Sequence, residues 1–377
     1  MDVAFFRHNI EEEDIQEVIR VLRGPFLTTG PEAERFEEKL GSFLGGMRVV
    51  SLSSATAGLH LMLEALGVEK GDEVITTPLT FASTAISICH QGAVPIFADV
   101  EKDTGNLDVE QVRQVFSPRT KAILPVHLYG QMCDMKAFSS FAKEAGVVLV
   151  EDAAHALEAN RDGIRPGALS QGACFSFYAT KNLTCGEGGA VATMDPVLAE
   201  RIRSLRLHGL SKDAAMRYSS GYQHYDIRQI GWKYNLNDIL CALLIHQMDR
   251  LQAYSQRRQE IASLYTEGFQ DLEEISLPKT FPNACHARHL YVIWVDPGAR
   301  DPLLLHLQSQ GIGVSVHFNP VHLMSYFRET YGFTHGCFPE AERIGASTVS
   351  LPFYPKLEDG QVQRVIEAVR GFFKKGQ

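Results

Sequence analysis

The feature that most constrains the fold is an alternation, between residues 47 and 150, of short apolar runs with segments of helical periodicity. The apolar runs have the length of strands, and the segments between them place apolar residues three and four positions apart. This alternation is typical of βαβ units, which form a largely parallel sheet buried under helices on both faces. The expected strands are 47–52, 73–77, 94–98, 121–126 and 147–150, and the expected helices are 55–66, 81–90, 108–116 and 135–145.

The segments outside this alternation predict further elements. Amphipathic helices are expected over 11–23 and directly after Pro31, and two strands are expected to flank Lys181 within 172–193. We therefore expect two domains, a large one over 1–251 that includes the N-terminal segment and a small α/β domain over 252–377. The other expected elements are helices 196–207, 237–251, 254–269, 302–310 and 359–373, and strands 291–295 and 313–316.

Composition excludes several classes of function. The formal charge of −9, without a basic stripe, argues against a nucleic-acid partner. The seven cysteines are odd in number and form no CxxC pair, which argues against a disulfide framework and favours the cytoplasm. Neither a leader peptide nor an apolar run of ~18 residues is present, so we expect no membrane span.

The most informative residue is Lys181, which lies between an aromatic run and a Gly-Glu-Gly-Gly turn. Most lysines lie on the surface, so a solvated side chain is the alternative to a functional one. Two neighbours favour function: Ser176 is on the same run, and Asp152 ends a buried strand, with His155 close behind it. A lysine, a strand-end aspartate and hydroxyl or glycine donors for a phosphate are the components of a pyridoxal phosphate (PLP) site.

Other polar residues also follow expected strands, where ligands of parallel sheets bind. Ser54 and Ala55 open a helix, so they suit a phosphate, although serine is also a common helix cap. Phe81 either stacks on a flat ring or joins the helix core. The hydroxyls of Thr28 and Thr29 cap the next helix by default, with substrate contact as the alternative. His317 and His322 have no carboxylate or thiol at ligand spacing, so we expect no metal there.

Over nearly the whole chain, these residues resemble the DegT family of sugar-nucleotide aminotransferases. These are PLP enzymes of the aspartate-aminotransferase fold (fold type I), with a large domain around a mostly parallel seven-stranded sheet and a small C-terminal α/β domain. Each motif is modest alone, but their order and spacing together are specific. The matching motifs are 27–31, 53–57, 71–81, 120–127, 151–155, 175–184, 186–189 and 231–236.

The resemblance implies a role for each matching residue. Lys181 matches the Schiff-base lysine, Asp152 the partner of the pyridine nitrogen, and His155 a residue near the ring hydroxyl. The other implied PLP contacts are Phe81 on the ring, Ser54, Ala55 and Ser176 at the phosphate, and either Lys233 or Asn235 at the phosphate of a second subunit. The candidate substrate contacts are Thr28, Thr29, Arg228, His317 and His322.

The implied function is transamination, with L-glutamate as donor and a nucleotide-linked ketosugar as acceptor. The subgroup features look most like UDP-4-amino-4-deoxy-arabinose aminotransferases, which favours a UDP-4-keto sugar and a role in lipopolysaccharide or related glycan synthesis. The resemblance also implies a homodimer with shared active sites. The rival functions are a PLP-dependent sugar dehydratase, against which Lys181 argues, a non-catalytic regulator that binds a PLP-sugar adduct, and an amino-acid transaminase with Arg228 or Arg7 as its carboxylate clamp.

Two features depart from the family pattern. Glu158 stands where relatives usually have glycine, and residues 241–246 replace a run of small residues. We expect these departures to affect packing or the subunit contact rather than the chemistry.

Overall fold

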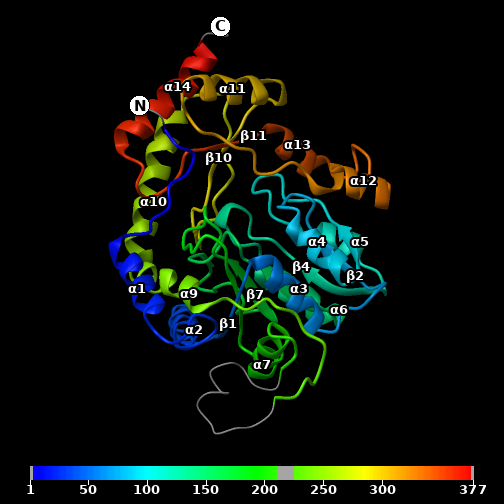
Figure 1. The fold of residues 1–377 in the computed structure, drawn as a ribbon. Coiled ribbons are helices and arrows are strands. Elements are labelled where there is room, and N and C mark those ends of the chain that lie inside the picture. Colours follow the sequence, from blue (N-terminus) through cyan, green and yellow to red (C-terminus); the bar gives the residue numbers. More distant parts are fainter. Residues whose placement is uncertain (1–2, 211–224, 375–377) are drawn as a thin grey trace.

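The computed structural model describes residues 3–210 and 225–374 and is built around one seven-stranded sheet (Figure 1). The strand order is β1-β8-β7-β5-β4-β2-β3, and only β8 runs against the others. The predicted mostly parallel seven-stranded sheet is therefore confirmed. The strands are β1 (Arg48–Leu52), β2 (Glu73–Thr76), β3 (Val94–Phe97), β4 (Thr120–Leu124), β5 (Val148–Asp152), β7 (Gly172–Ser176) and β8 (Gly189–Thr193).

Helices cover both faces of the sheet because successive strand residues point to opposite sides. On β2, Ile75 belongs to one apolar core and Val74 to the other, and on β5 the same holds for Leu149 and Val150. The first core includes residues of α2 (Pro31–Phe43), α6 (Met135–Ala145) and α9 (Asp238–Ile245). The second includes residues of α3 (Ala55–Ala65), α4 (Ser83–His90) and α7 (Pro196–Leu205), while α5 (Val109–Val115) contributes Val112 to the first.

The C-terminal part has its own core around the antiparallel pair β10 (Tyr291–Trp294) and β11 (Thr348–Leu351). Its helices are α11 (Pro297–Ser309), α12 (Ser325–Tyr331), α13 (Pro339–Ser347) and α14 (Asp359–Lys374). Helix α10 (Gln247–Phe269) runs from α9 beside the sheet to these helices (Figure 1). The division at residues 251 and 252 remains a proposal, and it would fall inside α10.

Several predicted elements differ from the structure. The expected strand 313–316 forms no ladder, because its backbone divides between two partners: Ser315 bridges Ser350, whereas the Gly313 amide donates to the Val3 carbonyl. The expected helix 302–310 begins earlier, at Pro297, since Asp296 caps it by accepting from the Gly298 amide. The expected helix 237–251 divides at His246, and its second half continues into α10. Helices α12 and α13 and strand β11 were not predicted.

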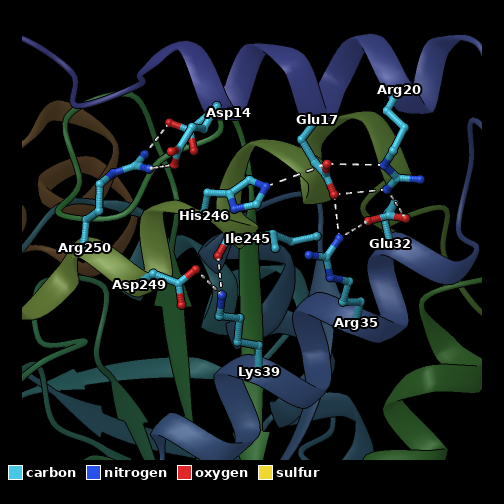
Figure 2. A network of polar contacts seen from close by, with 11 residues as sticks. Asp14, Glu17, Arg20, Glu32, Arg35, Lys39, Ile245, His246, Asp249 and Arg250 are labelled. Carbon is cyan, nitrogen blue, oxygen red and sulfur yellow. Dashed lines mark hydrogen bonds and ion pairs between the residues drawn. The ribbon is translucent and has the colours of Figure 1, made fainter.

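The N-terminal helix α1 (Glu12–Leu22) is fastened to the α9–α10 junction by charged side chains (Figure 2). The buried carboxylate of Asp14 accepts from the Arg250 guanidinium at 2.5 Å. Glu17 lies 2.5 Å from Arg35 of α2 and 3.7 Å from the His246 imidazole. These contacts join α1 to α2 and to the α9–α10 junction. In the described part of the chain, every helix is too short or too polar to cross a membrane.

Candidate active site

A cavity of about 420 Å³ lies where several strands of the sheet end. Segments that follow β1, β2, β5 and β7 contribute to its wall, as expected for a ligand site in a parallel sheet. His289, which precedes β10, and His317 and Phe318, which lie between α11 and α12, also line the cavity. The lining residues that matter below are Ser54, Ala55, Thr80, Phe81, Asp152, His155, Ser176, Tyr178, Lys181, Glu187, His289, His317 and Phe318.

Lys181 reaches this cavity from the turn between β7 and β8. Burial disfavours its charged form and lowers the pKa of its amine from 10.5 to about 7, although the Asp152 carboxylate acts in the opposite direction. The Nζ atom of Lys181 lies 3.4 Å from Nε2 of His289. A lysine held this way is partly neutral near pH 7, so it can act both as a nucleophile and as a base.

Asp152 ends β5 and is almost fully buried. Its Oδ2 accepts a hydrogen bond from the Thr84 hydroxyl at 2.8 Å, and its Oδ1 accepts one from the Ala154 amide at 3.1 Å. Burial raises the pKa of this carboxyl, while Thr84, the Ala154 amide and Lys181 lower it. Among the described residues, hydrogen-bond donors contact this carboxylate and no cation forms a salt bridge with it. The carboxylate also lines the cavity.

Three neutral imidazoles surround the lysine. Burial lowers the pKa values of His155, His289 and His317, and the nearby Lys181 lowers them further. The rings of His155 and His289 lie 4.4 Å apart, and Nδ1 of His317 lies 2.8 Å from the Ser350 hydroxyl. Nδ1 of His155 is buried and has no partner among the described residues, as expected of an atom that meets a ligand.

The start of α3 combines the two roles that the sequence left open. The Ser54 hydroxyl caps the helix by accepting from the Ala57 amide at 3.0 Å, and Ser54 and Ala55 also line the cavity. The start of β8 approaches them so closely that a Cβ atom at Gly189 would overlap the backbone of Ser54 and Ala55. Only glycine allows this approach. The first turn of α3 therefore presents backbone amides to the cavity, where an anion is favoured.

Six of the predicted site residues do not line the cavity of this chain. Thr29 is buried, accepts from the Asn235 amide at 2.6 Å and donates to the Leu236 carbonyl at 3.2 Å. Thr28, Lys233 and Arg228 are exposed. The residues outside the cavity are Thr28, Thr29, Arg228, Lys233, Asn235 and His322.

The predicted role of the Thr28 and Thr29 hydroxyls as caps of α2 is wrong. Asp238 of α9 supplies the cap instead, because its carboxylate accepts from the amides of Gly30 at 2.8 Å and Ala33 at 3.1 Å. The motifs 27–31 and 231–236 thus fold against each other.

His322 is likewise not brought to the cavity. It is fully buried, its Nε2 lies 3.0 Å from Glu342, and its ring packs against Phe338. It occupies the position of a core histidine, whereas His317 lies on the cavity wall.

Sequence reasoning missed Thr84, which holds Asp152 without lining the cavity, and several residues that do line it. Thr84 follows Phe81 by one helical turn, so the hydroxyl-rich start of that helix was a usable signal. His289 had no such signal, because it lies in a loop more than a hundred positions from Lys181. Tyr178, Thr80 and Glu187 also line the cavity.

A half-buried lysine that shares a cavity with a strand-end aspartate and a helix N-terminus is typical of PLP-dependent enzymes of fold type I. The family comparison agrees: the DegT/DnrJ/EryC1/StrS aminotransferase family model matches residues 8–370. The chain belongs to this family, and the predictions of the family, of its fold type and of a PLP-dependent aminotransferase are confirmed.

The similar proteins are related over nearly their full lengths. The spore coat polysaccharide biosynthesis protein SpsC of Bacillus subtilis is 43% identical over 97% of this chain and 95% of its own. The structure of DesV from S. venezuelae, in complex with a ketimine intermediate, is 36% identical, with a TM-score of 0.89 over 96% of this chain and 94% of that chain. Spr1654 of Streptococcus pneumoniae in its PMP-form is 31% identical, with a TM-score of 0.93 over 99% of this chain and 100% of that chain.

Proposed function

We propose that this protein transfers an amino group from L-glutamate to a nucleotide-linked ketosugar, with PLP as the carrier. The observation that carries the proposal is the placement of the Lys181 amine, with a pKa of about 7, in one cavity with the Asp152 carboxylate. Lys181 would hold the cofactor covalently, and Asp152 would keep the pyridine nitrogen protonated. When bound, PLP supplies an electron sink for the bond-breaking step at the amino carbon.

The cavity residues suit this cofactor. Phe81 lines the cavity although 63% of its surface is exposed, which suits a ring that stacks on a flat ligand. Ser54, Ala55 and Ser176 would hold the phosphate at the N-terminus of α3. His155, with its unpaired Nδ1, would meet the ring hydroxyl.

The chain's own contribution to the reaction is proton transfer by Lys181. When it is not bonded to the cofactor, its amine would be the group that accepts the proton of the amino carbon and gives it up again. A pKa of about 7 makes both directions accessible at neutral pH. The neutral imidazoles around it do not compete for that proton, because burial lowers their pKa values.

The charge of the cavity favours a sugar as the acceptor. Among the described lining residues, Lys181 is the only lysine or arginine, so the cavity of this chain offers no guanidinium that would select a dicarboxylic acceptor. The carboxylates of the glutamate donor would be met by groups outside this lining. The acceptor would therefore present an uncharged keto ring, with Thr28, Arg228 and His317 as candidate contacts. We retain a UDP-4-keto sugar as the first candidate, and synthesis of lipopolysaccharide or another cell-surface polysaccharide in the cytoplasm as the setting.

We further propose a homodimer with shared active sites. Ile227, Ile230 and Trp232 expose apolar surface in the segment that leads to Lys233. Asn235 donates to Thr29 of its own chain. Lys233 lies in an exposed position, and a lysine ammonium is a common phosphate ligand, so Lys233 is our candidate for the residue that reaches the phosphate of the partner subunit.

The test is turnover of L-glutamate with UDP-, dTDP- and GDP-linked 4-keto and 3-keto sugars, read by mass spectrometry of the product. The expected product is an amino sugar, with 2-oxoglutarate formed in equal amount. Turnover of simple 2-oxo acids with no aminated sugar would contradict the proposal and favour an amino-acid transaminase.

A further inference from the structure

Glu158, the residue that departs from the family pattern, lies deep in the molecule beside the lysine loop. Its side chain is buried, and one of its carboxylate oxygens, Oε1, accepts a hydrogen bond from the guanidinium of Arg258. The other oxygen, Oε2, accepts from the side-chain amide of Asn182 at 2.9 Å. The expectation that this departure affects only packing or the subunit contact is therefore incomplete, because Asn182 is the neighbour of Lys181.

Arg258 anchors the carboxylate from α10. The guanidinium is 1% exposed, and Glu158 is its sole ion-pair partner among the described residues. Its Nε and Nη1 atoms are buried without partners in the described part of the chain. A buried guanidinium with a single carboxylate is costly to separate from that carboxylate, so the position of Glu158 is fixed strongly.

Asn182 joins this pair to both sides of the lysine site. The same amide nitrogen that donates to Glu158 also donates to the Ala287 carbonyl at 2.9 Å. Ala287 is two residues before His289, whose Nε2 lies 3.4 Å from the Lys181 amine. Both atoms that this nitrogen faces are oxygens, which can only accept. The side-chain amide of Asn182 must therefore point its nitrogen, and not its oxygen, toward them.

We propose that Glu158 is a positioning residue for Lys181: anchored by Arg258, it fixes Asn182 and so holds the lysine loop and the His289 segment at one distance from each other. This inference depends on the proposed role of Lys181 in holding PLP. It predicts that loss of the Glu158–Asn182 contact loosens the hold of the protein on its cofactor. The reason is that a small displacement of the Lys181 amine makes its bond to PLP harder to form.

The experiment measures how long PLP stays bound after transfer of the holoprotein into PLP-free buffer, by the decay of its visible absorption band. The variants are Glu158→Gln, which keeps the shape but removes the charge, and Asn182→Ala, which leaves the ion pair intact. Arg257→Gln is the matched control, since Arg257 is the next residue on α10 and pairs with the exposed Asp359 at 2.6 Å. We expect both variants to shorten PLP residence about tenfold or more, and the control to match the wild type.

The double variant distinguishes positioning from a general loss of stability. If Glu158 acts through Asn182, the double variant Glu158→Gln/Asn182→Ala should shorten PLP residence no more than either single substitution does. Additive effects, or residence in Asn182→Ala equal to that of the control, would overturn the inference. A wild-type protein that gains no visible band with PLP would overturn the proposed function itself, and this inference with it.

Discussion

Lys181 and Asp152 face the same cavity, yet burial acts on them in opposite chemical directions. It lowers the pKa of the amine and raises the pKa of the carboxyl, so both groups move toward neutrality. Thr84 and the Ala154 amide oppose this effect at Asp152 by hydrogen bonding to its charged form. These two hydrogen bonds favour the carboxylate form, which suits a cationic partner, in our proposal the protonated pyridine nitrogen.

Replacing Asp152 with asparagine tests this role. The amide keeps the size of the side chain but cannot stabilise a protonated ring nitrogen, so the rate of transamination should fall by about 10³-fold or more. Circular dichroism and thermal unfolding should show an intact fold. Near-normal turnover of the Asp152→Asn protein would refute the assignment.

The pKa of Lys181 also predicts a pH dependence of stability. The amine titrates at about 7 in the folded protein and near 10.5 when unfolded, so the unfolded chain binds more protons between these values. The cost of burying Lys181 is therefore complete below pH 7 and disappears as the pH rises toward 10.5. Lys181→Met should stabilise the cofactor-free protein by about 1–3 kcal/mol at pH 6, a value discounted because the lysine is only half-buried, and by much less at pH 10. Urea titrations at the two pH values measure this, and an equal gain at both would contradict it.

Among the elements, the sheet was predictable because its strands are buried on both faces and read as apolar runs. The first turn of α2 was not, because its capping carboxylate comes from Asp238, which is 208 positions from Gly30. The same limit applies to the site. The sequence pattern was enough to single out Lys181, Asp152 and Ser54, because each lies at a strand end or in a turn. It did not single out His289 or the Glu158–Asn182 contact, because these depend on the folding of distant loops against one another.

Helix α1 provides a prediction at the level of elements. Arg250 of α10 is the cation nearest to the buried Asp14 carboxylate (Figure 2), and burial already raises the pKa of that carboxyl. Arg250→Met leaves the carboxylate without its charge partner, so the free energy of unfolding should fall by about 2 kcal/mol at pH 7. Lys279→Gln is the control, because its pair with Asp103 is exposed and should contribute less than about 0.5 kcal/mol. Equal losses in urea titrations of the two variants would contradict the prediction.

At the scale of the whole molecule, the exposed segment before Lys233 predicts the subunit contact. Ile230 is 87% exposed in the single chain, which suits burial against a second copy. Analytical ultracentrifugation should give the wild type at twice the chain mass of 41.9 kDa. Ile230→Glu should shift it to the monomer mass and weaken PLP binding. A dimeric Ile230→Glu protein with wild-type PLP affinity would contradict this contact.

The central claim is that Lys181 carries PLP and that L-glutamate donates the amino group. The most direct measurement is the absorbance spectrum of the purified protein with added PLP, before and after L-glutamate. We predict a visible band that glutamate converts to a near-ultraviolet one, and that is absent in Lys181→Ala. A protein without the band, or with a band that glutamate leaves unchanged, would contradict the account.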